Sequence, residues 1–345
     1  VGSNIGVTVT GSLTGLSAAN YSLTAPTGLT ANITPKALTM VGLSANDKVY
    51  DGNTTAVIVG TAALTGSVAV GAGNVLDGKW YVGDSVAITG PPVGTFNSKN
   101  VAEASSVTYS GLSLNNTNYS LTLQSPSTAH ITPKQVTLLA SKTYDGTTDL
   151  TGAVTVGGTV GSEQLGYLGA TANDVHVGTL SKFINAITLA NGGTGATAGL
   201  AANYSLPALN AANAPVTINA KALTISGTSA VSDKVYDGTT TATITGGTLS
   251  GAVAGDVLVL AQAGTFASAN VANAIAVTDA SSFTVSTSTH SSATSDYTLP
   301  TLTGLRGNIT PKILIVTASN DAKFAGTSDA AGFAGVSYSG FVNGE

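Results

Sequence analysis

The stretch Lys48-Val-Tyr-Asp-Gly-Asn-Thr54 decides the architecture of this 345-residue chain, because close copies of it occur three times. It returns as Lys142-Thr-Tyr-Asp-Gly-Thr-Thr148 and as Lys234-Val-Tyr-Asp-Gly-Thr-Thr240. The copies lie about 90 residues apart, which is the size of a small domain. The sequence therefore predicts a tandem array of similar modules rather than one large domain.

Three other patterns recur in step with this motif. A seam of Ile-Thr-Pro-Lys, or a close variant, precedes an apolar run at 33–36, 131–134, 218–221 and 309–312. An Asn-Tyr or Asp-Tyr pair opens an alternating stretch at 20–21, 118–119, 203–204 and 296–297. Gly-Thr-Phe stands at 94–96 and 264–266, and the middle repeat offers only the weaker Gly178-Thr-Leu180. Proline lacks an N–H donor and fixes φ, so it suits a stiff crossover between strands.

The seam lysines divide the chain into five segments. Short alternating stretches between turn residues predict an all-β fold, with each module a small antiparallel β-sandwich of Ig-like size strung end to end with the next. A β-grasp-like module is the alternative. The expected modules are 37–134, 135–221 and 222–312, flanked by incomplete ones at 1–36 and 313–345. We expect the incomplete modules to be completed by a longer polypeptide or by a neighbouring copy.

Composition narrows the function classes. Charged residues make up 8% of the chain and the net charge is −5, so no basic surface is expected for nucleic acid, and no membrane insertion is expected. Cysteine is absent, which excludes disulfides and thiolate metal sites. The three histidines stand in no catalytic spacing. We therefore expect neither an enzyme nor a bound cofactor.

The repeated motif is interpreted first as a turn. Its aspartate would accept backbone N–H bonds, its glycine would adopt positive φ, and its tyrosine would pack. The residues concerned are Lys48, Tyr50, Asp51 and Gly52, then Lys142, Tyr144, Asp145 and Gly146, and finally Lys234, Tyr236, Asp237 and Gly238. Calcium at these aspartates, with Asp47 and Asp233 nearby, is one alternative. A lysine isopeptide link is another.

One local feature is unique to the first repeat. Asp77-Gly-Lys-Trp-Tyr81 holds the only tryptophan, and Asp-Gly favours a hairpin turn. A projecting hairpin could present Trp80 and Tyr81 to a sugar or to another subunit. The alternative interpretation is that Trp80 covers the core of its own module.

Taken in order, the four patterns resemble the YDG-type repeats of large bacterial surface proteins, including filamentous-haemagglutinin-like adhesins. The resemblance covers about 37–312, and the final segment, with Lys323-Phe-Ala-Gly326, looks like the start of an MBG-type module. It implies a secreted protein at the bacterial cell surface, in which these modules form a stalk or fibre without enzymatic activity. Its partners would be neighbouring modules, copies of the same protein, or host or matrix glycans and proteins. The alternatives are a filament or sheath subunit and a carbohydrate-binding module that uses Trp80 and Tyr81.

Overall fold

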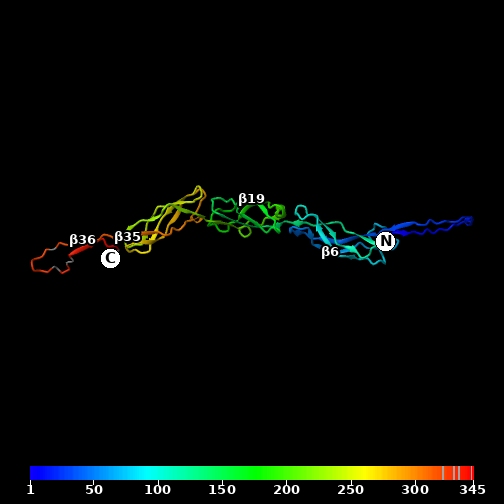
Figure 1. Cartoon of the computed structure of the whole chain (residues 1–345), viewed down its shortest axis with the longest axis horizontal. Helices are drawn as coiled ribbons and strands as arrows, with labels where there is room; N and C mark the ends of the chain where they lie inside the picture. Colours follow the sequence, from blue (N-terminus) through cyan, green and yellow to red (C-terminus); the bar gives the residue numbers. More distant parts are fainter. Residues whose placement is uncertain (321, 329–330, 333–334, 343) are drawn as a thin grey trace. The chain divides into compact units, whose positions relative to one another are not determined.

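The computed structural model describes residues 1–320, 322–328, 331–332, 335–342 and 344–345. Strands account for 44% of the chain and 3-10 turns for 4%. No α-helix occurs among the described residues. The prediction of an all-β fold is confirmed, and Figure 1 shows strands and loops throughout the described residues. Within the described ranges, no helix has both the length and the apolar character needed to cross a bilayer.

The chain divides into two compact units. Unit 1 comprises Val1–Thr137, Val156–Tyr167 and Leu189–Pro207, and unit 2 comprises Leu138–Thr155, Leu168–Thr188 and Ala208–Glu345. The module boundaries at 134 and 221 therefore stay a prediction.

Unit 1 is built from short strands and three 3-10 turns. Its elements are β1 (Gly2–Gly6), η1 (Ala18–Asn20), β2 (Thr30–Ile33), β3 (Lys36–Ala45), β4 (Lys48–Val49), β5 (Thr55–Ala56), β6 (Ile58–Leu64), β7 (Ser67–Val68), β8 (Trp80–Tyr81), β9 (Ile88–Thr89), β10 (Val93–Phe96), β11 (Ser106–Ser110), β12 (Ser113–Leu114), β13 (Tyr119–Thr122), β14 (Ser127–Thr128), β15 (Ile131–Thr132), β16 (Lys134–Gln135), η2 (Gly195–Thr197), η3 (Ala201–Asn203) and β21 (Tyr204–Ser205). Four strands contribute residues to both units, namely β17 (Thr137–Thr143), β18 (Val154–Gly157), β19 (Leu165–Ala172) and β20 (Ile184–Asn191).

Unit 2 has the same character. Its own elements are β22 (Val216–Asn219), β23 (Lys221–Ala222), β24 (Thr224–Ser226), β25 (Ala230–Val231), β26 (Lys234–Val235), β27 (Thr241–Ala242), β28 (Ile244–Thr245), β29 (Thr248–Ser250), β30 (Val257–Ala261), β31 (Gly264–Phe266), β32 (Ala272–Asp279), β33 (Ser282–Thr287), η4 (Thr294–Asp296), β34 (Tyr297–Thr298), β35 (Arg306–Thr310), β36 (Ile315–Ala318) and β37 (Val336–Ser339).

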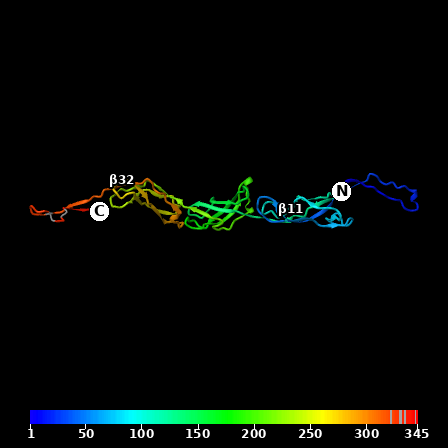
Figure 2. The same cartoon turned by 90° about the horizontal axis from the view of Figure 1, so that it is seen from below.

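Strand pairing is mixed, which corrects the expectation of antiparallel sandwiches. In unit 1, β14, β11, β10 and β5 form an antiparallel sheet, but β13 pairs with β3 in parallel. In unit 2, β26 pairs in parallel with β35 of a five-stranded sheet. Parallel neighbours need a long connection, and here most of a repeat separates the two strands. Figure 2 labels β11 and β32, which lie in the two larger sheets.

Each unit buries its own apolar residues. Strand β3 alternates buried and half-buried positions, so that Leu38 and Met40 are fully buried in unit 1. The core cluster of unit 2 consists of Ala242, Ile244, Phe266, Val277, Leu305 and Ile309. A fully buried side chain of this size stabilises a fold by about 1.5–3 kcal/mol. Each unit therefore has an apolar core of its own, formed by side chains on alternate strand positions.

The two end segments pack less than the rest. None of residues 1–35 is buried, and β1 and β2 form a two-stranded ribbon that projects from the rest of unit 1 (Figures 1 and 2). At the other end, within the part of the chain that the structure describes, β36 pairs only with β37, and the residues from 313 onward are exposed or half-buried. Both ends therefore leave strand edges open to further pairing.

The Asp77-Gly78 hairpin prediction is wrong. Strand β8 pairs in parallel with β7, with Trp80 opposite Ser67 and Tyr81 opposite Val68, so the loop between them cannot be a hairpin turn. Asp77 instead accepts hydrogen bonds from the backbone of Asn74 and Lys79 and shapes a loop. Its carboxylate also lies 2.9 Å from Lys36 Nζ, a pairing across the unit that a local sequence signal cannot report.

Candidate functional site

The three motif turns have one shared geometry. Lys48, Lys142 and Lys234 each place Nζ 2.7 Å from the aspartate three residues on. The same Nζ donates to the backbone carbonyl five residues on, at 2.9, 2.8 and 2.6 Å. The aspartate accepts the backbone N–H two residues ahead, which defines an Asx turn. The motif lysine therefore closes the turn from inside.

Each turn is attached to the seam of its own repeat. Tyr50 N donates to Thr132 O at 2.9 Å, after β4 has paired in parallel with the seam strand β15. Tyr236 N likewise donates to Thr310 O at 2.9 Å beside β35. Because the seam leads into the next repeat, this pairing directs the motif tyrosine toward the residues that follow the seam.

The first tyrosine cluster consists of Tyr50, Glu163, Asn203 and Tyr204 and lies within unit 1. Tyr50 Oη donates to Glu163 Oε1 and Tyr204 Oη donates to Glu163 Oε2, both at 2.7 Å. The two rings meet edge to face, with centroids 5.4 Å apart and an interplanar angle of 76°. Both tyrosines are buried. One carboxylate therefore joins the motif tyrosine to the Asn-Tyr pair of the following repeat.

The second tyrosine cluster consists of Tyr144, Asp256, Asp296 and Tyr297 and lies within unit 2. Its rings are again 5.4 Å apart, at 79°. Tyr297 donates to Asp256, whereas Tyr144 bonds to Ser292, whose hydroxyl donates to Asp256 at 2.6 Å. Aspartate is one methylene shorter than glutamate, and the serine hydroxyl bridges the difference. The same arrangement is thus reached with a different acid.

Two of the motif glycines lie against the following repeat. Gly52 and Gly146 have φ of 81° and 79°, a backbone conformation that favours glycine. A Cβ on Gly52 would stand 3.0 Å from Val160, and one on Gly146 would stand 2.8 Å from His290. Glycine is required here both by the turn and by the close approach that brings each tyrosine to its carboxylate.

The residue before the second tyrosine adds a further link. Asn203 Oδ1 accepts the N–H of Val101 at 2.9 Å, and Asp296 Oδ1 accepts the N–H of Val177 at 2.7 Å. Val101 and Val177 therefore hold equivalent positions. This corrects the assignment of the middle repeat's fourth pattern to Gly178-Thr-Leu180, because Ala170-Thr-Ala172, five residues before Val177, holds the place of Gly94-Thr-Phe96. Substitution of phenylalanine by alanine hid the correspondence.

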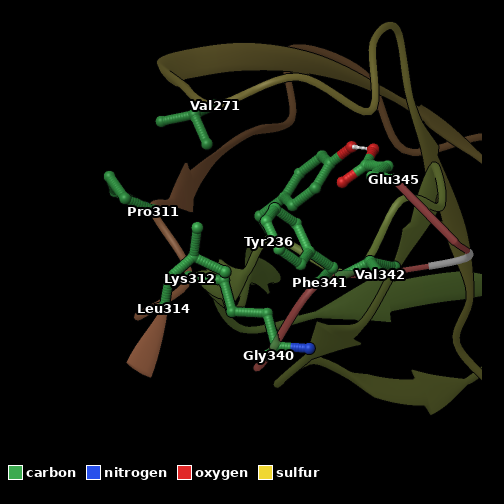
Figure 3. A pocket seen from close by; sticks show the side chains of 9 residues that line it. All are labelled: Tyr236, Val271, Pro311, Lys312, Leu314, Gly340, Phe341, Val342 and Glu345. Atoms are coloured by element: carbon green, nitrogen blue, oxygen red, sulfur yellow. Dashed lines mark hydrogen bonds between the residues drawn. The ribbon is translucent and has the colours of Figure 1, made fainter. Parts of the chain in front are cut away.

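The third motif tyrosine meets the final segment. Tyr236 Oη donates to Glu345 Oε1 at 2.5 Å, and Figure 3 shows its ring beside Phe341. These residues line a pocket of about 280 Å³ with Val271 and Leu314. Val271 follows Asn270 as Val101 follows Asn100. Tyr50 and Tyr236 thus donate directly to a downstream acid, and Tyr144 is linked to one through the Ser292 hydroxyl.

Asp256 lies in a grouping of serine, histidine and acid that resembles a catalytic triad. Ser288 and Ser292 donate to its carboxylate at 2.5 and 2.6 Å, and His290 Nδ1 lies 3.2 Å away. A triad needs the serine hydroxyl on the far ring nitrogen of histidine, whereas both serines here bond to the acid. The side chain of Asp256 is fully buried. The grouping satisfies a buried carboxylate and prepares no nucleophile.

The residues named above for calcium and for sugar binding make other contacts in the structure. Asp47 accepts the N–H of His130, and Asp233 accepts from Asn308, so these acids hold the seam strand. No group of three or more potential metal ligands occurs in the described ranges. Trp80 and Tyr81 are half-buried, and the Tyr81 ring lies 4.3 Å from Lys36 Nζ.

Comparison with known proteins adds the family. The YDG domain matches residues 34–129 and 219–304, together more than half of the sequence. The chain belongs to the YDG domain family. No curated protein and no solved structure matches it. Both YDG matches contain a Tyr-Asp-Gly turn, whereas the middle repeat, with Tyr144, lies outside them.

The acids of the two tyrosine clusters were not predicted from the sequence, although the sequence contains a signal for them. Glu163 and Asp256 each stand three residues after a backbone donor to the tyrosine, since Val160 N donates to Tyr204 Oη and Val253 N to Tyr297 Oη. The sequences Val160-Gly-Ser-Glu163 and Val253-Ala-Gly-Asp256 share a small residue before the acid. Tyr81-Val-Gly-Asp84 and Val342-Asn-Gly-Glu345 repeat the spacing. The pattern becomes visible when glutamate and aspartate are taken as equivalent.

The first tyrosine cluster should make the stability of unit 1 fall at alkaline pH. Burial, then the hydrogen bond to the Glu163 carboxylate, raises the pKa of Tyr204 to about 12, from an ordinary value of 10.0. Because the folded-state pKa lies above the unfolded one, the protonated tyrosine contributes on the order of 2 kcal/mol to the free energy of unfolding. This contribution is fully present below pH 10 and is lost as the pH rises toward 12. Urea unfolding between pH 9 and 12, followed by the fluorescence of Trp80 in unit 1, measures this. Glu163→Gln should make the loss smaller and complete at lower pH, because the folded-state pKa of Tyr204 moves back toward 10.0. An unchanged profile would contradict the assignment.

Proposed function

We propose that this chain is a structural segment of a secreted bacterial cell-surface adhesin, which extends the protein and presents binding regions carried elsewhere. The observation that supports this best is the near-identical geometry of the two tyrosine clusters, each joining a motif turn to the repeat that follows. A contact repeated in every module serves linkage, whereas catalysis or ligand recognition concentrates distinctive residues in one place. We accordingly propose no enzymatic activity and no cofactor for these repeats.

The clusters are suited to a mechanical linkage. Hydrogen bonds to a carboxylate contribute about 1.5–3 kcal/mol each, and an edge-to-face aromatic pair about 0.5–1.5 kcal/mol. Both kinds of contact lie buried, where water cannot replace them during slow extension. Stability then sums over repeats and their contacts with nearest neighbours. Adding repeats would add length without a change in chemistry.

Stretching single molecules tests the linkage. Pulled from both ends, the chain should unfold in steps of about 30 nm, since about 90 residues extend by about 3.3–3.6 Å each. Tyr50→Phe should lower the force of the steps, because it removes one donor to Glu163 while the ring stays in place. Tyr21→Phe, at an exposed tyrosine, is the matched control. A single step for the whole chain would contradict independent repeats.

The cellular role needs a separate test. Antibodies raised against the purified chain should label intact, unpermeabilised cells of the producing bacterium, and brief protease treatment of those cells should remove the label. Labelling only after permeabilisation would overturn the extracellular placement.

We further propose that residues 313–345 begin an MBG-type module, as the altered Lys323-Phe-Ala-Gly326 indicates.

A further inference from the structure

Unit 1 contains a third carboxylate and tyrosine pair of the same design. Tyr119 donates to Asp84, and its Oη accepts the N–H of Tyr81 at 3.0 Å. The donor again stands three residues before the acid, as Val160 stands before Glu163. Asp84, Asn118 and Tyr119 are therefore the counterparts of Glu163, Asn203 and Tyr204.

The link to the preceding asparagine is present here as well. The Val1 nitrogen donates to Asn118 Oδ1 at 3.1 Å, as Val101 N donates to Asn203 Oδ1 at 2.9 Å. Val1 is followed by the strand β1, as Val271 is followed by β32. Of the groups that build the first tyrosine cluster, the motif tyrosine alone has no counterpart at this position.

A pocket lies where that tyrosine would stand. It measures about 440 Å³ and is lined by Val1, Lys36, Tyr81, Asp84, Asn118 and Tyr119, among others. Its walls offer a carboxylate, the ring of Tyr119 and apolar surface from Ile33 and Pro35. A carboxylate and a tyrosine ring likewise meet the motif tyrosine in the two occupied clusters, through Ser292 in the second. The pocket differs from a general apolar groove because its acceptor is already placed.

We propose that this pocket binds the tyrosine of a Tyr-Asp-Gly turn supplied by a YDG module joined to Val1. The phenol hydroxyl donates to Asp84, its ring meets Tyr119 edge to face, and the glycine of the turn lies against Tyr81, the counterpart of Val160. The proposal rests on the linkage role given above to the motif tyrosines. The direction is fixed by the other contacts, in which the hydroxyl of each motif tyrosine bonds to the segment that follows its own repeat.

An extended chain tests the proposal. Residues 37–100 of this sequence are duplicated in front of Val1, so that a copy of Asn100 precedes Val1 as Asn100 precedes Val101. Hydrogen exchange at residues 115–123, read by mass spectrometry, should slow about tenfold or more, because the tyrosine adds a hydrogen bond to a charged acceptor. Changing the added copy of Tyr50 to alanine, or Asp84→Asn in the extended chain, should remove most of that protection.

Three results would overturn it. They are exchange that does not slow in the extended chain, equal slowing when the added tyrosine is alanine, and concentration-dependent association of the unextended chain that Asp84→Asn abolishes, which would put a second copy in the pocket. The failure is distinguishable from failure of the proposed function, because the force measurement on Tyr50→Phe does not involve Asp84. The proposal for the pocket can therefore fail while the proposed linkage by the motif tyrosines holds.

Discussion

Replacing Tyr144 by alanine should lower the free energy of unfolding of unit 2 by about 3–5 kcal/mol, the range for truncation of a buried aromatic side chain. Tyr144 is fully buried, meets Tyr297 edge to face and bonds to Ser292. Removing the ring leaves a cavity and takes away the hydrogen bond between Tyr144 and Ser292, whose hydroxyl keeps its bond to Asp256. Denaturant unfolding, with hydrogen exchange used to separate unit 2 from unit 1, measures the change.

Two control variants locate the cause. Tyr144→Phe keeps the ring and loses only the hydroxyl, so it should cost about 1 kcal/mol. Tyr21→Ala removes a tyrosine that is 74% exposed, and it should change stability by no more than about 0.5 kcal/mol. If Tyr144→Ala costs no more than Tyr21→Ala, the second tyrosine cluster does not hold unit 2 together.

Much of the fold was predictable because its signals are local. Alternation in Lys36–Ala45 predicts a strand with Leu38 and Met40 on the buried face, and the structure has β3 there. The Asp and Gly of the motif have turn chemistry that depends only on near neighbours. The strand character of the seams follows from β-branched residues beside proline. These features need no knowledge of distant parts of the chain.

The clusters were not predictable from the same reasoning, because their members are far apart in sequence. More than 100 residues separate Tyr50 from Glu163 and Tyr144 from Asp256. Nothing near Tyr50 indicates that its hydroxyl needs a carboxylate from the next repeat. The Asp77-Gly78 prediction failed for the related reason that Lys36, a distant partner, fixes the loop. The mixed pairing also arises from long connections, which local alternation cannot report.

Replacing Asp256 by alanine should destabilise unit 2 by about 2–4 kcal/mol. Its buried carboxylate accepts hydrogen bonds from Ser288, Ser292 and Tyr297, and alanine would leave these donors without an acceptor. Asp84→Ala is the matched control, because Asp84 is exposed and its carboxylate accepts from Tyr119. A smaller cost at Asp84 would show that the number of buried donors, rather than the tyrosine alone, sets the effect. Equal losses of stability in Asp256→Ala and Asp84→Ala would contradict this dependence on the number of buried donors.

The same carboxylate makes unit 2 sensitive to acid. Burial by itself raises the pKa of Asp256, but the hydrogen bonds from Ser288, Ser292 and Tyr297 outweigh it and lower that pKa to about 2, from 3.8. Because the folded-state pKa lies below the unfolded one, the ionised carboxylate adds to the free energy of unfolding. This contribution is fully present above pH 4 and is lost as the pH falls toward 2. The stability difference between the unmodified chain and Asp256→Asn should therefore shrink across this interval, measured by denaturant unfolding of unit 2. A difference that stays constant from pH 5 to pH 2 would mean that Asp256 is held by shape rather than by its charge.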